Sequence, residues 1–127
     1  VGPFTSTEGL YDRATGHEPF VLSQRWIDAR GRLDPRAIFN AATSTDVIGG
    51  NSGGPLLDRG GDVVGAVFDG NVHLLGGEYF YDGALNRSVI VSATIIHAAL
   101  SDVYGMSALV SELEGRQERP FLPGGAE

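Results

Sequence analysis

A glycine-rich stretch holds the residue best suited to chemistry, a serine within Gly49-Gly50-Asn51-Ser52-Gly53-Gly54-Pro55-Leu56-Leu57. A serine hydroxyl is a poor nucleophile until a neighbouring base removes its proton, and its attack on a carbonyl needs donors for the oxyanion that forms. Because Gly50 has no Cβ, the turn can aim the amides of Gly50 and Ser52 at one point. The stretch therefore predicts Ser52 as a nucleophile and the backbone of Gly50 and Ser52 as an oxyanion hole.

The residues after Ser52 predict the strands that would support it. A short apolar strand, a hairpin turn and a valine-rich return strand are expected at Pro55–Leu57, Asp58–Gly61 and Asp62–Phe68. A further turn at Asp69–Asn71 and a strand at Asn86–Val91 follow. An isolated Gly-x-Ser-x-Gly would be a weak signal, but here motif and strand context agree. The alternative is that Ser52 is only a small turn residue.

Four regions organise the rest of the chain. Residues 1–40 predict a peripheral segment with one short helix at Leu22–Arg30, which Ser23 would cap. Residues 41–91 hold the β segment with the nucleophile loop, and residues 92–114 predict two helices, with Ser92 or Thr94 as the first cap. Residues 115–127 predict a flexible tail. The expected fold is therefore mainly β with C-terminal helices.

Composition excludes several classes of function. The 127 residues carry a net charge of −7, which argues against a nucleic-acid partner because phosphate binding needs clustered cations. Cysteine is absent, so disulfides and thiolate metal sites are excluded, and the three histidines lack metal-ligand spacing. No stretch is long and apolar enough to span a membrane. We therefore expect no metal, no other cofactor, no nucleic acid and no membrane span.

The serine motif with its hairpin resembles the second barrel of chymotrypsin-like serine peptidases, so the resemblance implies one β-barrel half of such a double-barrel enzyme. By that resemblance Ser52 takes the nucleophile position, and Val64–Val67 forms the strand that places Phe68, Asp69 and Gly70 along the substrate. Asn51 stands where trypsin-type enzymes carry an aspartate that pairs with a freed N-terminus. We therefore expect no such activation switch.

Two longer stretches narrow the resemblance. Residues 3–26, "PFTSTEGLYDRATGHEPFVLSQRW", and residues 44–92, with the motifs F-D-G-N and L-N-R-S-V, are similar to the C-terminal region of bacterial dipeptidyl-peptidases 7 and 11. The resemblance extends over residues 3–113. It implies a large enzyme with an inserted helical domain, exported to the periplasm or cell surface and able to form a homodimer. Its substrate would be a peptide with a free N-terminus, from which it removes dipeptides.

The same resemblance assigns roles in substrate binding. Asp69 would hold the α-ammonium of the substrate, although Asp-Gly is also a common turn pair. Gly70 stands where an arginine marks the members that cleave after Asp or Glu, and a glycine would leave the pocket neutral and open. We therefore expect a hydrophobic penultimate residue. Asn71 would lie in the same wall.

Asp46 has two interpretations. It lies six residues before Ser52, where trypsin-like enzymes place the acid at the base of the primary specificity pocket, so it would predict cleavage after Arg or Lys. The dipeptidyl-peptidases carry an aspartate there without that specificity. A role in capping or hydrogen-bonding the loop is therefore favoured over substrate binding.

No histidine in the chain is a suitable base for Ser52. In this fold the histidine and aspartate of the triad precede the serine, and only His17 does so, in a turn without strand context. His73 and His97 follow the serine. We therefore expect that this chain is a C-terminal fragment, that the base and its carboxylate lie outside it, and that the isolated fragment is inactive.

Two alternatives to the dipeptidyl-peptidase remain open. One is a trypsin-like or Deg-type serine endopeptidase, against which F-D-G-N and the lack of an attached peptide-binding domain argue. The other is a non-catalytic, peptidase-like binding module. Such a module has no need of an oxyanion hole, so the intact G-N-S-G-G-P favours catalysis.

Overall fold

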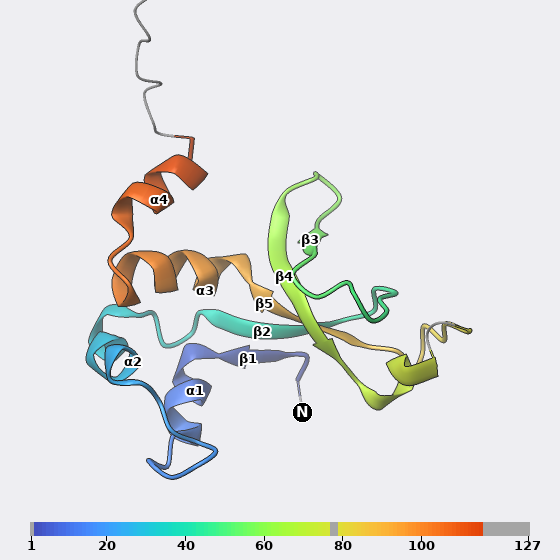
Figure 1. Cartoon of the computed structure of the whole chain (residues 1–127), viewed down its shortest axis with the longest axis horizontal. Helices are drawn as coiled ribbons and strands as arrows, with labels where there is room; N and C mark the ends of the chain where they lie inside the picture. The colour runs from blue at the N-terminus through green and yellow to red at the C-terminus, as the bar shows by residue number, and fades with distance from the viewer. Residues whose placement is uncertain (1, 77–78, 116–127) are drawn as a thin grey trace, which may run out of the picture.

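The computed structural model describes residues 2–76 and 79–115, and a single sheet forms its centre. The strands are β1 (Phe4–Ser6), β2 (Ile38–Thr43), β3 (Pro55–Leu57), β4 (Val63–Gly70) and β5 (Ser88–Ser92). They pair antiparallel in the order β1-β2-β5-β4-β3 (Figure 1). The three predicted strands are thus confirmed as β3, β4 and β5, although β4 continues through Asp69 and Gly70, where a turn was expected.

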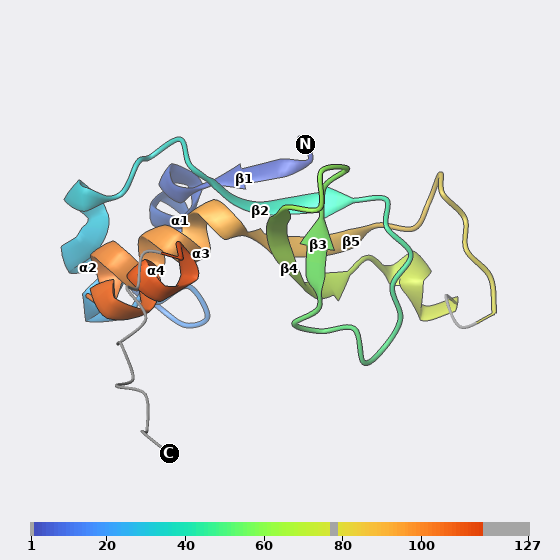
Figure 2. The same cartoon turned by 90° about the horizontal axis from the view of Figure 1, so that it is seen from above.

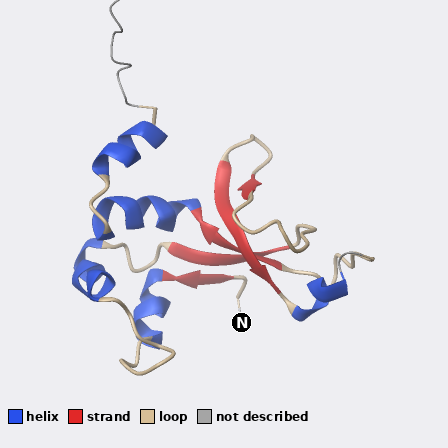
Figure 3. Cartoon of the chain, viewed as in Figure 1, coloured by secondary structure: helices blue, strands red, loops and turns tan. Residues whose placement is uncertain are grey.

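Helices gather at one end of this sheet. They are α1 (Thr7–Arg13), α2 (Gln24–Ala29), η1 (Arg30–Arg32), α3 (Ala93–Ala98), the π-helical η3 (Ala99–Val103) and α4 (Ser107–Leu113). One further 3-10 helix, η2 (Val72–Gly76), lies at the opposite end, beyond the last residue of β4 (Figure 2, Figure 3). We call the end of the molecule with α1, α2, α3 and α4 the helical end, and the end with η2, where a pocket is described below, the pocket end. No helix in the described ranges is long and apolar enough to cross a bilayer.

The sheet and the helical end are held by different small cores. In the sheet, Ala41, Val67 and Ile90 are buried together on β2, β4 and β5. At the helical end, a second buried cluster consists of Ala29, Leu33 and Val103, with Trp26 and Tyr11 among the residues packed against it. Trp26 is therefore a packing residue of this cluster.

Tyr11 also joins α1 to α2. Its hydroxyl donates to the carbonyl of Trp26 at 2.6 Å. Burial raises the pKa of the Tyr11 phenol, and the nearby guanidinium groups of Arg30 and Arg32 oppose that rise. The phenol thus stays protonated and able to donate at neutral pH.

The prediction of a peripheral segment at residues 1–40 with one short helix is wrong. β1 joins the sheet beside β2, α1 follows at once, and β2 itself begins at Ile38. The side chain of Ser6 accepts from the Gly9 amide as an N-cap of α1. Ser23 does stand at the N-cap of α2, but its side chain makes no capping hydrogen bond.

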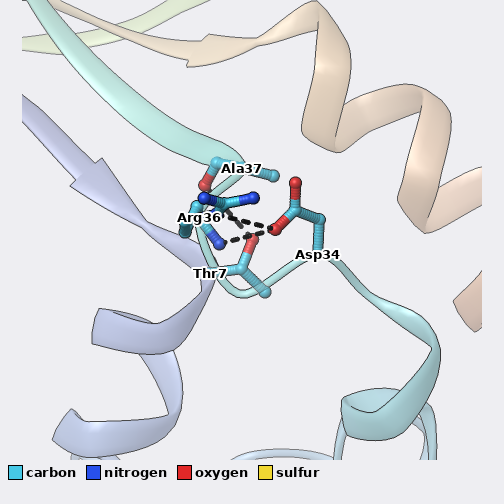
Figure 4. Close-up of polar contacts among 4 residues, drawn as sticks. All are labelled: Thr7, Asp34, Arg36 and Ala37. Atoms are coloured by element: carbon cyan, nitrogen blue, oxygen red, sulfur yellow. Dashed lines mark hydrogen bonds and ion pairs between the residues drawn. The ribbon is translucent and has the colours of Figure 1, made fainter.

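Hydrogen bonds at Thr7 explain why this segment is integral to the fold. Thr7 is 1% exposed, and both its amide and its hydroxyl donate to the carbonyl of Ala37, at 3.0 and 3.3 Å (Figure 4). Asp34 shapes the same turn, because its carboxylate accepts from the Arg36 amide at 2.9 Å. The turn that leads into β2 is therefore fastened to the start of α1.

The C-terminal helices follow the expected plan. Ser92 caps α3, since its hydroxyl accepts from the Ile95 amide at 3.1 Å. The same hydroxyl donates to the carbonyl of Ile38, so it joins the helix to β2. Gly105, with φ of +66°, separates η3 from α4. Of the predicted flexible tail at 115–127, all but Gly115 lies outside the described residues.

Candidate active site

The loop from β2 to β3 carries Ser52 and is fixed where it leaves β2. The hydroxyls of Thr43, Thr45 and Ser88 form a closed triangle, with Oγ–Oγ distances of 2.5 Å from Ser88 to each threonine and 2.8 Å between the threonines. Ser88 is fully buried. Tyr81 adds a hydrogen bond from its hydroxyl to the carbonyl of Ser44. The first residues of the loop are therefore tied to β5 and to the segment before it.

Asn51 shapes the turn that presents Ser52. Its side-chain oxygen accepts from the Ile48 amide at 2.8 Å, and its own amide donates to the Ile48 carbonyl at 3.2 Å. Its carbonyl then accepts from the Gly54 amide at 2.9 Å. Sequence analysis assigned Asn51 only the loss of an activation switch, whereas the structure gives it a role in closing the loop.

The far side of the turn is joined to β4. The Gly53 amide donates to the Val67 carbonyl at 2.7 Å, and the Val67 amide donates to the Gly54 carbonyl at 2.9 Å. These bonds extend the β3–β4 pairing back to the residue next to Ser52. Gly53 has φ of +83°, a conformation that other residues rarely adopt, so the turn requires a glycine there.

The side chain of Ser52 is accessible. It is exposed, and neither its hydroxyl nor its amide forms a hydrogen bond with any residue in the described ranges. The amide of Gly50 also donates to nothing in that part of the chain. Both residues are exposed, so these two amides are open to solvent and to a ligand. Accessible backbone donors of this kind are what an oxyanion hole requires.

A β-bulge in β4 positions the residues that lie on the other side of the site from the Ser52 loop. The β4–β5 register shifts between Val67 and Asp69, so Phe68 is the extra residue. In a regular strand without a bulge, Asp69, two residues after Val67, would point to the same face as that buried side chain. In the bulged strand, Asp69 is exposed and Phe68 is 47% exposed. The bulge thus turns both side chains away from the core.

One pocket of about 250 Å³ joins these two walls. It brings together five of the predicted site residues, namely Ser52, Phe68, Asp69, Gly70 and Asn71. Its remaining lining residues are Val47, Ile48, Gly49, Leu74 and Leu75. Gly50 and Asp46 are not among the lining residues. Asp46 is exposed and makes no hydrogen bond with a described residue, so the loop-capping contact expected for it is not formed.

Of the described residues that line the pocket, Asp69 alone is charged. Its carboxylate accepts from the amide of Gly70 at 2.8 Å and forms no ion pair within the described residues. An exposed carboxylate without a cationic partner is suited to a ligand ammonium group. The sign and place of this charge agree with the role expected for Asp69.

Asn71 lines the pocket but is held by the chain that follows. Its side-chain amide donates to the Leu85 carbonyl at 2.7 Å, and its side-chain oxygen accepts from the Arg87 amide at 3.1 Å. Its backbone amide donates to the Arg87 carbonyl at 2.8 Å. Asn71 therefore anchors the end of β4 to the segment before β5.

Sequence analysis missed the apolar residues of the pocket, above all Leu74 on η2. A Cβ placed on Gly70 would lie 1.8 Å from Leu74 Cδ1, so Leu74 occupies the space that the missing side chain leaves. The expectation of an open pocket beside Gly70 is therefore wrong at this point. The apolar run Val72–Leu75 was the available signal, but only the fold shows that its residues turn back onto β4.

The histidines are not bonded to Ser52. His97 Nε2 lies 3.1 Å from Glu114 Oε1, and His17 and His73 are exposed. In the described ranges no three His, Cys, Asp or Glu side chains are grouped so as to hold a metal ion. Within the described ranges, Ser52 and the pocket that it lines thus have no histidine bonded to the serine.

Comparison with known proteins identifies relatives over most of the chain. Residues 1–115 match the family model described as Peptidase S46. Dipeptidyl-peptidase 7 of Capnocytophaga gingivalis is 31% identical over 71 residues, which are 56% of this chain and 10% of that protein. The Asp/Glu-specific dipeptidyl-peptidase of Shewanella putrefaciens is 28% identical over 142 aligned positions, which cover 88% of this chain and 19% of that protein.

A solved structure has the same fold. The crystal structure of Porphyromonas endodontalis DPP11 in complex with the dipeptide Arg-Asp matches with a TM-score of 0.81 and 21% identity. The match covers 90% of this chain and 18% of that one. The chain thus spans 10 to 19% of the length of these three proteins. The antiparallel sheet with its helices is shared with DPP11.

Proposed function

Because this chain belongs to the S46 family of peptidases, we propose that it supplies the nucleophile and the substrate pocket of a serine-type dipeptidyl-peptidase. Such an enzyme removes dipeptides from the N-termini of peptides. One observation carries the proposal: Ser52, which has no hydrogen-bond partner in the described ranges, lines the same pocket as Asp69, a carboxylate without an ion-pair partner there. A nucleophile and an ammonium-binding group in one small pocket suit a substrate cut near its free amine.

The proposed reaction assigns a step to each group. Ser52 Oγ attacks the carbonyl carbon of the second residue, and the amides of Gly50 and Ser52 stabilise the oxyanion. The C–N bond then breaks, the proton from the hydroxyl passes through the base to the leaving amine, and water hydrolyses the acyl-enzyme. The base and its carboxylate lie outside this chain in the proposal, and the chain forms part of one barrel of a chymotrypsin-like enzyme.

The pocket favours a particular substrate. Asp69 would bind the α-ammonium, and the remaining lining residues are uncharged and largely apolar. Val47, Ile48 and Leu74 offer contacts to an aliphatic side chain and none to a carboxylate. We therefore propose a preference for hydrophobic penultimate residues, in contrast to the Asp/Glu-specific relatives.

Asp46 does not line the pocket. It therefore does not support the alternative of an endopeptidase that cleaves after Arg or Lys. A non-catalytic binding module would not need the free amides of Gly50 and Ser52. No residue contact described in this site favours either the endopeptidase or the binding module.

The test uses the full-length protein encoded by the gene, assayed on dipeptidyl fluorogenic substrates with free and with blocked N-termini. The second residue would be Leu, Met, Asp or Arg. We expect turnover only with a free amine, highest for Leu or Met, and a loss of at least about 10⁴-fold in Ser52→Ala. Ser23→Ala is the matched control, because that exposed serine makes no side-chain capping bond and lies at the helical end.

Each other result has a defined meaning. Cleavage of blocked substrates after Arg would support the endopeptidase. A folded full-length protein that cleaves none of the substrates would support the binding module. Turnover that survives in Ser52→Ala would remove the serine from the mechanism.

A further inference from the structure

Leu74 holds a defined place in the pocket. It lies on η2, its amide donates to the Asn71 carbonyl at 3.0 Å, and its side chain is half-buried. By contrast, Val72 and Leu75 on the same short helix are 70% and 84% exposed. Among the leucine and valine residues of η2, Leu74 alone packs inward.

The packing of Leu74 depends on Gly70. A Cβ on Gly70 would lie 1.8 Å from Leu74 Cδ1 and 3.0 Å from Leu74 Cγ. Real Cβ atoms do not approach other heavy atoms this closely, so the two side chains cannot share the space. The glycine therefore makes room for the leucine and not for solvent.

The position of η2 is fixed by polar contacts. Asn71, directly before η2, is joined by three hydrogen bonds to Leu85 and Arg87. Because Asn71 also accepts from the Leu74 amide, the leucine is tied to the end of β4. This fixed start is what lets a leucine on so short a helix hold one place in the wall of a binding site.

From this geometry we infer that Leu74 determines which penultimate side chains the pocket accepts. The inference rests on the proposed function and deepens it. Leu74 fills the space beside Gly70 and limits the length of the apolar side chain that fits between Val47, Ile48 and Phe68. Its removal would enlarge the pocket toward aromatic side chains, and a side chain on Gly70 would displace it.

The first experiment compares substrates within single variants of the full-length enzyme. The measured quantity is the ratio of kcat/KM for a penultimate Phe to that for a penultimate Met, both with free N-termini. This ratio does not depend on how much of a preparation is folded. Loss of three carbon atoms from a specificity pocket changes discrimination by about tenfold or more. We expect Leu74→Ala to raise the ratio about tenfold, Leu74→Phe to lower it, and Val72→Ala to leave it unchanged.

The second experiment tests the coupling with Gly70. Gly70→Ala alone should reduce kcat/KM for the Met substrate about tenfold, since its methyl group displaces Leu74. The double variant Gly70→Ala/Leu74→Ala should recover to within about threefold of Leu74→Ala, because contacting residues are not additive. A purely structural role would make the double variant worse than either single one.

The outcomes distinguish a failure of the role of Leu74 from a failure of the proposed function. Turnover by the unaltered enzyme with a Phe/Met ratio that Leu74→Ala and Leu74→Phe do not change would overturn the role of Leu74 and leave the proposed function intact. Absence of dipeptide release by the unaltered enzyme would overturn the proposed function and this inference with it.

Discussion

The helical end and the pocket end of this chain are stabilised differently. At the helical end, a buried cluster of Ala29, Leu33 and Val103 joins α2, the residue after η1, and η3, and the aromatic residues Tyr11 and Trp26 pack against it. At the pocket end, apolar side chains such as Leu75 and Phe80 are 84% and 69% exposed. There the chain is fixed by hydrogen bonds of hydroxyl, asparagine and backbone groups, as at the Thr43–Thr45–Ser88 triangle and at Asn71.

The difference shows how a small chain can hold a site that is open to solvent. Burial cannot stabilise a loop whose serine and amides must stay accessible, so directional hydrogen bonds hold that loop. Removing a buried apolar group should therefore affect stability mostly at the helical end. Removing a polar group should affect the site mostly at the pocket end.

The sharpest test applies the same substitution at both ends. Leu33→Ala should lower the free energy of unfolding by about 3 kcal/mol, because Leu33 is 6% exposed and its loss leaves a cavity. Leu75→Ala should change it by less than about 0.5 kcal/mol, because that side chain is already in water. Urea unfolding of this chain, followed by tryptophan fluorescence, measures both. Equal effects would contradict the division into two ends.

Asp69→Asn tests the charge at the pocket end. The substitution should lower kcat/KM on free-amine substrates of the full-length enzyme about 100-fold, because it removes the charge that would bind an ammonium group. The thermal midpoint should stay within about 2 °C, since Asp69 has no ion-pair partner in the described ranges. Asp46→Asn is the matched control and should leave kcat/KM unchanged. A large loss with Asp46→Asn instead would favour the endopeptidase.

Ser88→Ala tests the hydroxyl triangle. It should cost about 2 kcal/mol in the free energy of unfolding, because the two threonine hydroxyls lose a partner in a buried place. Ser101→Ala at the helical end should cost less than about 1 kcal/mol, because that half-buried hydroxyl makes a single bond of 3.3 Å. Chemical denaturation of this chain compares the two. If Ser101→Ala proved the more damaging, the triangle would not be what holds the loop.

Tyr11→Phe tests a hydrogen bond between α1 and α2 at the helical end. Loss of its bond to the Trp26 carbonyl should cost about 1 kcal/mol at pH 7. Because the folded pKa of Tyr11 lies above the unfolded value, the phenol binds its proton more tightly in the folded state. Its stabilising contribution is thus complete below pH 10, and it falls as the pH rises through the folded pKa. Unfolding curves between pH 8 and about 11 should show a decline in the parent chain that is smaller in Tyr11→Phe.

The pocket end was largely predictable because its signals are local. In the β3–β4 hairpin that supports it, the Asp58 carboxylate accepts from the amides of Gly60 and Asp62, so the five residues 58–62 shape the turn through contacts among themselves. The glycines around Ser52 likewise predict a tight turn. The position of Leu74 was not predictable, since it depends on how Asn71 is held by residues 85–87 across the chain.

The N-terminal part was the least predictable. β1 has three residues, and its Phe4 pairs with Ala41, so only a long-range contact makes it a strand. α1 has seven residues, with a glycine in its first turns. Its cap at Ser6 was the available local signal. Elements this short have too little periodicity of their own to show in a sequence.

The bulge at Phe68 places a limit on how this region can diverge. Side chains in a strand alternate between faces, so one residue inserted between Val67 and Asp69 would bring the carboxylate to the face that packs against Ala41 and Ile90, whereas deletion of Phe68 would remove the bulge and keep Asp69 on its present face. Exchanging Phe68 for another apolar residue would leave the alternation intact. Among homologous chains, an added residue between the buried valine and the acidic residue should therefore be rarer than a change in the identity of the residue between them.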